Sequence, residues 1–218
     1  MKPQAAVLTG DLVDSSGASP VAVEAAMGRI AAIADRIGRE VTAFSRHRGD
    51  GWQLYLERPG LALTTTLLIC AELRAEGGLE SRIAMGLGGA HMGSFKNPAA
   101  VRDLGAATGT AFISSGRALD SMDKSSRLSI AGEGVDALHA RLIAMIEEQV
   151  MTWSREQAEA MALALDPKDP PTQQAMAEKL GITRQAVAAR LHAAGYRQLN
   201  GAAQDFLTTF GGEPDSHD

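Results

Sequence analysis

The sequence predicts a protein of the α+β class, in which a mixed domain of order β-α-β-β-α-β, with one extra helix and strand, is followed by an all-α module. Over residues 1–134, short apolar runs with strand character alternate with stretches of helical periodicity. After Val135 the apolar stretches have helical spacing, and the proline-rich segment 166–171 interrupts them once.

Length and composition indicate a folded protein with a large aliphatic core. The chain has 218 residues, of which 45% are hydrophobic and 4% aromatic. Its net charge of −5 argues against a protein that coats nucleic acid or membranes through its overall electrostatic field. Any DNA contact is therefore expected in one module. Cys70 is the only cysteine and excludes an intrachain disulfide, which suggests a reducing compartment. The first apolar run is too short for a signal peptide, and we expect a cytoplasmic protein without a membrane span.

Residues 40–56 predict a β-hairpin, with strands 40–45 and 52–56 around Gly49-Asp50-Gly51. Asp-Gly is common in type I′ turns because both central residues need a positive φ, so the simple interpretation of Asp50 is a turn residue. A second acidic loop, residues 9–16, follows the apolar run 5–8 and contains Asp11. Two strand ends would then each present an aspartate.

The other elements of the first domain follow from capping and stop signals. Ser19 and Pro20 predict the start of a helix that ends before Gly38. We further expect a helix over 61–75, a strand over 81–87, a helix over 106–121 and a strand over 126–130. Up to the strand at 81–87, this order is that of a ferredoxin-like fold.

The second half begins with an amphipathic helix over 135–150. Its apolar stripe could pack on the first domain or pair with the same helix of a second subunit. Ser154 and Gln157 form a capping box that predicts the next helix. A short helix over 206–210 and a polar, disordered tail complete the chain.

Residues 172–195 carry the most specific motif. Two helices are expected around a turn at Gly181, with Thr183 capping the second helix and Val187 packing back against the first. The pattern resembles the helix-turn-helix of bacterial regulators, and residues 166–199 carry five basic and three acidic side chains. The alternative is a helical hairpin for protein contact. The predicted DNA-contacting residues are Thr183, Arg184, Gln185, Ala188 and His192.

The first domain resembles the palm of class III nucleotidyl cyclases and diguanylate-cyclase (GGDEF) proteins, in which one metal-binding Asp ends the first strand and another lies in a Gly-Asp hairpin. The resemblance implies Mg²⁺ bound by Asp11, Asp50 and the Leu12 carbonyl, together with nucleotide phosphates. Gly109 and Arg117 match the family's helix pattern. The base-recognition pattern is not kept, because Arg46, Ala106 and Ile113 stand where the family has lysine, aspartate and asparagine. The predicted phosphate-binding residues are Ser15, Ser16, Arg46, Arg48 and Arg117.

An acidic first loop, a Gly-Asp-Gly hairpin and a C-terminal helix-turn-helix together resemble the SatD-like group of bacterial proteins. The predicted organisation is a palm-like domain (1–134), a connecting helix (135–152), a helix-turn-helix domain (153–210) and a tail (211–218). We expect a homodimeric DNA-binding transcription regulator that senses a nucleotide and metal. The alternatives are an active Mg²⁺-dependent nucleotidyl cyclase or nucleotidyltransferase, with Arg117 as the one catalytic candidate, and a catalytically dead palm used for dimerisation.

Overall fold

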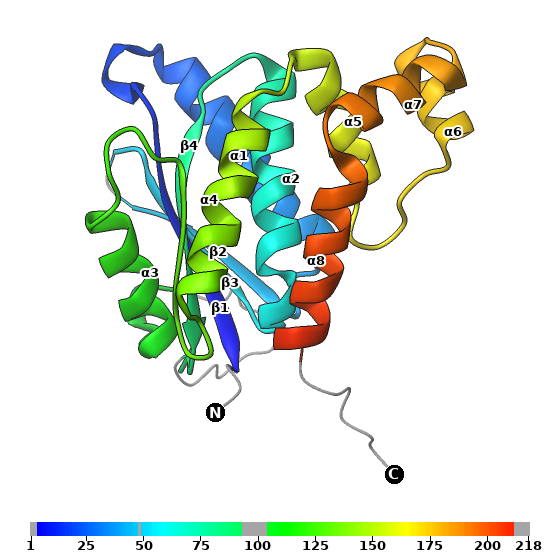
Figure 1. Ribbon diagram of the computed structural model, residues 1–218. Helices are drawn as coiled ribbons and strands as arrows, with labels where there is room; N and C mark the ends of the chain where they lie inside the picture. Colours follow the sequence, from blue (N-terminus) through cyan, green and yellow to red (C-terminus); the bar gives the residue numbers. More distant parts are fainter. Residues whose placement is uncertain (1–3, 48, 93–103, 212–218) are drawn as a thin grey trace.

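The computed structural model describes residues 4–47, 49–92 and 104–211, and in these residues it has a five-stranded sheet and eight α-helices (Figure 1). The predicted mixture of helices and strands is therefore confirmed. The strands are β1 (Ala5–Leu12), β2 (Thr42–Arg46), β3 (Gly51–Leu56), β4 (Ser81–Gly88) and β5 (Leu128–Gly132). The helices are α1 (Pro20–Ile37), α2 (Ala62–Glu76), α3 (Thr110–Asp120), α4 (Ala137–Met151), α5 (Arg155–Ala164), α6 (Gln173–Leu180), α7 (Arg184–Ala193) and α8 (Tyr196–Phe210).

The strands lie in the order β2-β3-β1-β4-β5, so β1 is central. It pairs antiparallel with β3 on one side and with β4 on the other, and the β2–β3 hairpin forms one edge. Strand β5 pairs parallel to β4 at the opposite edge. Both crossovers through α1 and α2 thus leave one strand between the strands that they connect, as in split β-α-β units.

The two faces of the sheet are covered unequally. Leu8 and Leu12 of β1 belong to the large buried core that also contains residues of α1 and α2. Val7 belongs to a smaller cluster on the other face, which α3 covers. Helix α3 approaches β4 closely because Gly86 has no side chain, and a Cβ at that position would lie 2.2 Å from the Ala111 carbonyl oxygen.

Capping signals in the sequence place the helix ends correctly. The Ser19 hydroxyl accepts a hydrogen bond from the Ala22 N–H at 3.2 Å, and Pro20 is the first residue of α1. Gly77 ends α2 with φ 69°. The Ser154–Gln157 capping box begins α5. Local hydrogen bonds therefore fix these boundaries.

The first strand is longer than the sequence indicates. It extends to Leu12, so Asp11 is a strand residue, paired with Gly51 on β3 and Arg82 on β4, and does not lie in a loop. Pairing on both sides holds the polar end of β1 in the sheet. Gly10 permits this arrangement, because a Cβ there would lie 2.5 Å from the Trp52 ring.

The expected Asp-Gly turn is also wrong. Residues 47–50 connect β2 and β3, and among the described residues of this loop the positive φ (81°) is at Gly49. Asp50 is not in the left-handed region, and Gly51 is already the first residue of β3. The His47 N–H closes the loop on the Gly51 carbonyl at 2.8 Å. The aspartate is therefore not required by the turn conformation.

The helices of the second half pack onto the sheet domain. Helix α5 packs against α2, and α4 lies on β5. The buried cluster beneath α1 and α2 continues through Trp153, Met161, Val187 and Phe206. The predicted short helix 206–210 is the end of α8, which extends back to Tyr196 and contacts the segment Pro59–Leu61. The sequence hides this length because Gly201 and several polar residues interrupt the apolar pattern.

No helix in the described part of the chain is both long enough and apolar enough to cross a membrane. Of the predicted tail, only Gly211 is among the described residues.

Candidate functional site

Asp11, the first predicted metal ligand, is paired with an arginine. The Arg82 Nε donates to Asp11 Oδ1 at 2.9 Å, and Arg82 Nη2 donates to Oδ2. Both side chains are about one quarter exposed, at 26% and 27%. The hydrogen bond to Asp11 raises the pKa of Arg82, and the charge of Asp50 adds a smaller contribution. The guanidinium therefore holds both carboxylate oxygens that the sequence assigns to a metal.

Asp50 lies beside the end of β1, as predicted. Its carbonyl accepts the Leu12 N–H at 3.2 Å, and its carboxylate accepts the Ser15 hydroxyl. Ser15 begins a 3-10 turn, Ser15–Gly17, that follows Asp14 at φ 53°. The acidic loop and the hairpin loop are thus joined through both the backbone and the side chain of Asp50.

An open hollow of ≈ 360 Å³ lies next to Asp50. Ser15, Ser16 and Arg46 line it, together with Glu24 and the beginning of α1. Arg46 forms an ion pair with Glu24 and donates to the Gly49 carbonyl at 3.3 Å. The start of an 18-residue helix favours an anion, whereas the two carboxylates oppose one. A phosphate group would fit best with a divalent cation that offsets these carboxylates.

The three predicted metal ligands, Asp11, Leu12 and Asp50, meet only some of the requirements of a metal site. Within the described ranges, no group of three or more His, Cys, Asp or Glu side chains is placed to hold a metal ion. Mg²⁺ can bind through one or two carboxylates when phosphates and water complete its shell, so Asp50 and Asp11 would suffice in number. Asp11 would first have to separate from Arg82. Leu12 has a hydrocarbon side chain, which is buried, so only its backbone carbonyl could be a ligand. The metal assignment stays a prediction.

The predicted phosphate-binding arginines do not lie together. Arg46 borders the hollow near Asp50, whereas Arg117 lies on α3 and lines a different hollow of ≈ 480 Å³ along β5. Arg48 lies outside the described residues. Gly109 precedes the first residue of α3, and Ile113 is 52% exposed on that helix. Helix α3 is therefore not part of the hollow at Asp50.

Helices α6 and α7 are joined as the motif in residues 172–195 predicts. Gly181 ends α6 with φ 65°, and the Thr183 hydroxyl accepts the Ala186 N–H at 3.1 Å. Val187 and Leu191 are buried. Of the predicted DNA-contacting residues, Thr183, Arg184, Gln185 and His192 are exposed and Ala188 is partly buried.

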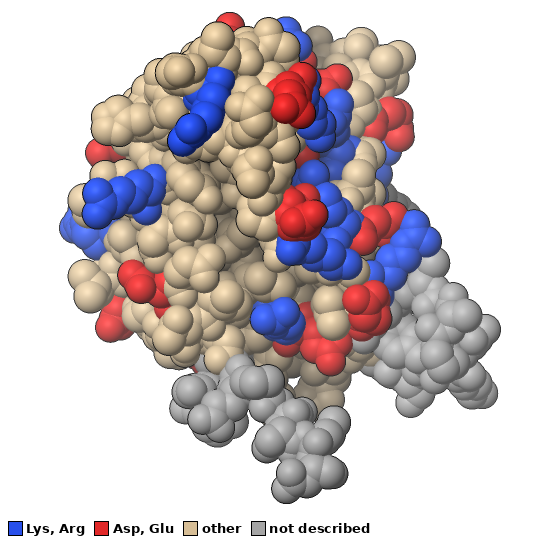
Figure 2. All heavy atoms as spheres, turned by 90° about the vertical axis from the view of Figure 1, so that its right-hand side faces the viewer, with Lys and Arg blue, Asp and Glu red and all other residues tan. Residues whose placement is uncertain are grey.

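The surface that carries these helices is not uniformly basic. Figure 2 shows scattered Lys and Arg side chains among uncharged residues on this face, and further basic side chains mixed with acidic ones along one side. On α7 itself, Arg190 is bound to Glu159 at 3.3 Å and so does not present a free charge. Any DNA contact must therefore rest on a few side chains.

No protein-family model matches this sequence, and no curated protein matches it.

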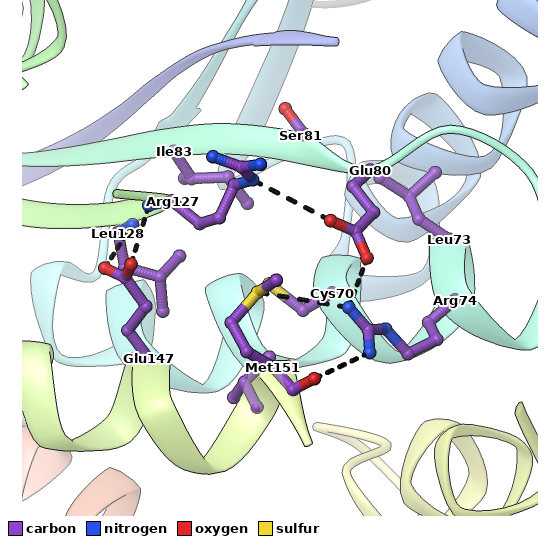
Figure 3. Close-up of a pocket in the computed structure, with 11 residues that line it drawn as sticks. Cys70, Leu73, Arg74, Glu80, Ser81, Ile83, Arg127, Leu128, Glu147 and Met151 are labelled. Atoms are coloured by element: carbon purple, nitrogen blue, oxygen red, sulfur yellow. Dashed lines mark hydrogen bonds and ion pairs between the residues drawn. The ribbon is translucent and has the colours of Figure 1, made fainter. Parts of the chain in front are cut away.

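Sequence reasoning missed a charged cluster between α2, α4 and the sheet (Figure 3). Glu80 forms an ion pair with Arg74 and lies 3.7 Å from Arg127 Nε. Arg74 also donates to the carbonyls of Met151 and Trp153, at 3.1 and 2.9 Å. Arg74 and Glu80 are six residues apart, but their other partners lie more than 40 residues further along the chain, and the only signal in the sequence was the presence of charged residues at the ends of apolar segments.

Trp153 extends these contacts to the last turn of α7. Its buried indole N–H donates to the Ala194 carbonyl at 2.9 Å. On the other side, the Glu80 carbonyl accepts the Val13 N–H at 2.8 Å, two residues from Asp11. Hydrogen bonds and ion pairs therefore connect the acidic loop with the end of α7 through Glu80, Arg74 and Trp153.

Proposed function

We propose that this protein is a transcription regulator that binds DNA through a helix-turn-helix formed by α6 and α7. The observation that carries the proposal is the outer face of α7. Arg184, Gln185 and His192 are exposed there, and their side chains have no hydrogen bond or ion pair to another described residue, while Val187 and Leu191 fix the helix from behind. Arginine and glutamine are suited to reading guanine and adenine edges in the major groove.

The position of these side chains supports the same proposal. Arg184 and Gln185 are the first two residues of α7, and a recognition helix contacts base edges mainly through its N-terminal residues. The Thr183 hydroxyl is already used as the cap, so Thr183 would act by holding the helix start in place.

A protein-docking role for the same helices is less well supported. The described chain has five large apolar side chains that are markedly exposed, and none of them lies on α6 or α7. Protein interfaces usually contain apolar or aromatic anchors at their centre. A polar helix face with an unpaired arginine fits DNA better.

We further propose that the hollow beside Asp50 binds a phosphate-bearing ligand, a nucleotide, together with Mg²⁺. Support comes from the mixture of groups in it: Ser15, Ser16 and Arg46 can meet phosphate oxygens, and Asp50 can meet the cation. The contacts through Glu80, Arg74 and Trp153 would carry the effect of binding toward α7. Catalysis would additionally require Asp11 to leave Arg82, and pyrophosphate release from nucleoside triphosphates would reveal it.

The DNA proposal is tested by selecting binding sites from random duplex DNA and measuring affinity for the enriched sequence. Arg184→Ala and Gln185→Ala should each weaken specific binding by about 1–3 kcal/mol. Lys124→Ala is the matched control, because Lys124 is an exposed cation in the loop after α3 on the other side of the sheet. Enrichment of no sequence, or equal losses for all three variants, would refute specific reading by α7.

A further inference from the structure

The outer face of α4 carries apolar side chains that nothing in the described chain covers. Leu138 is 74% exposed and Met145 is 63% exposed, whereas Met151 at the end of the same helix lines the small cavity of Figure 3 beside Arg74 and is 39% exposed. Leu138 and Met145 are two of the five large apolar side chains exposed in the described residues, and both belong to one 15-residue helix. Single exposed apolar residues are ordinary, but such a concentration on one helix indicates a contact surface.

The exposed residues form a regular stripe. Leu138 and Met145 are seven residues apart, and Arg141 and Glu148, also seven apart, lie beside them on the same face. The opposite face of α4 is occupied, because Ile143, Ile146 and Val150 are buried. In Figure 1, α4 lies at the front of the molecule to the left of α2, and no other helix or strand crosses in front of it. The helix therefore has one face for the core and a second face available for a partner.

The charges on this stripe are self-complementary, which favours a second copy of the chain as the partner. Arg141 and Glu148 are exposed, and neither side chain has an ion pair or hydrogen bond to another described residue. Two copies of α4 that run antiparallel, with the two-fold axis near Met145, would bring Arg141 of each chain near Glu148 of the other. A parallel pair would instead place like charges together, which is unfavourable.

We propose that α4 forms an antiparallel, two-fold symmetric contact with α4 of a second copy of this chain. Met145 lies at the centre next to its symmetry mate, Leu138 covers the last turn of the partner helix, and two Arg141–Glu148 pairs flank the apolar contact. Such a contact is isologous and closes at two subunits, so it forms dimers and not filaments. A 15-residue helix is about 22 Å long, which makes this a small interface. Small interfaces dissociate readily, so the dimer is reversible and concentration-dependent.

The first test is sedimentation of the full chain over a wide range of concentrations. Wild type should pass from monomer to dimer, and Leu138→Glu and Met145→Glu should each raise the dimer dissociation constant by at least about tenfold. Val21→Glu is the matched control, because Val21 is 77% exposed on α1, away from α4. It should dimerise as wild type does. Circular dichroism should show the same helix content in all four proteins, since the substituted side chains are exposed.

The second test uses the charges. Arg141→Glu and Glu148→Arg should each weaken dimerisation, because each places like charges across the two-fold axis. An equimolar mixture of the two variants should form heterodimers with wild-type affinity, because both contacts in the heterodimer then join opposite charges. The double variant Arg141→Glu/Glu148→Arg should likewise dimerise as wild type does.

Three results would overturn the proposal. Wild type could remain monomeric at its highest soluble concentration. Leu138→Glu and Met145→Glu could leave the dimer unchanged, which would place the interface elsewhere. The mixed charge variants could fail to associate, which would exclude the antiparallel arrangement.

Discussion

The Arg82 guanidinium holds both carboxylate oxygens of Asp11, at the end of the central strand and beside the hairpin loop. The pair joins β1 to β4 at a position that is about one quarter exposed, and ion pairs that solvent reaches typically stabilise a protein by about 0.2–1 kcal/mol. Its larger consequence concerns ligands. A cation that binds Asp11 has to displace the Arg82 guanidinium, which belongs to the same chain and stays nearby. The Asp11–Arg82 pair therefore lowers the affinity of Asp11 for a metal ion.

Arg82→Gln should therefore increase the affinity for Mg²⁺ in the presence of a nucleotide, because it frees Asp11, while it lowers the free energy of unfolding by about 1 kcal/mol or less. Titration calorimetry measures the first effect and urea unfolding the second. Arg39→Gln is a suitable control, since Arg39 also pairs with one aspartate but lies just after α1. Unchanged Mg²⁺ binding in Arg82→Gln would mean that Asp11 is a structural residue and no metal ligand.

Asp50→Asn should abolish the increase in melting temperature that Mg²⁺ and nucleotide produce in wild type. Asp50 is not in the left-handed region, so asparagine at position 50 preserves the backbone and removes only the charge. A ligand that binds only the folded state raises its stability according to occupancy, and a variant without the site loses that increment.

Asp11→Asn is the partner variant in this experiment. If both aspartates bind one ion, the double variant should behave like either single variant, because removing the second ligand of a lost site costs nothing more. Equal ligand-induced shifts in wild type and Asp50→Asn would instead show that residues 49–51 serve only as a loop.

A structural feature could be predicted from the sequence when the residues that determine it are neighbours in the chain, and could not when they are far apart in the chain. The cap at Thr183 and the turn at Gly181 were predictable because their hydrogen bonds and backbone angles involve neighbouring residues. The partner of Asp11 was not, because Arg82 is 71 residues away and faces Asp11 only through the β1–β4 register. The same holds for Trp153, whose carbonyl partner at Ala194 depends on how α5 and α7 pack.

The Trp153–Ala194 hydrogen bond leads to a prediction about α7. Trp153→Phe keeps a large aromatic side chain but leaves the buried Ala194 carbonyl without its donor, which should cost about 1–3 kcal/mol of stability. Amide hydrogen exchange should become faster at the end of α7 and at the start of α8, and remain unchanged in β1 and β4. Thr152→Ala is the control, because Thr152 is the adjacent residue but is exposed. Uniformly faster exchange in the sheet as well would show that Trp153 acts only through the common core.

Cys70 should make the protein sensitive to alkaline pH. The thiol lines the small cavity of Figure 3, and burial raises its pKa from 9.0 to about 12, an effect that nearby Arg74 opposes and that Glu80 and Glu147 increase. Well below pH 9 the thiol is neutral in both the folded and the unfolded state, so it contributes no pH dependence there. Between pH 9 and pH 12 the unfolded chain releases the proton while the folded chain retains it, so stability falls as pH rises.

The loss attributable to one thiol is at most about 1.4 kcal/mol per pH unit. Other groups also titrate in this range, so the measurement is the difference between wild type and Cys70→Ser, whose hydroxyl does not ionise there. Urea unfolding at intervals from pH 8 to pH 11 should show a steeper decline for wild type. The folded thiol should also resist a thiol reagent at pH 8, because its raised pKa keeps it un-ionised, and it should react once denaturant is added. Parallel pH profiles for the two proteins, or rapid labelling of the folded chain, would mean that the pKa of the Cys70 thiol is not raised.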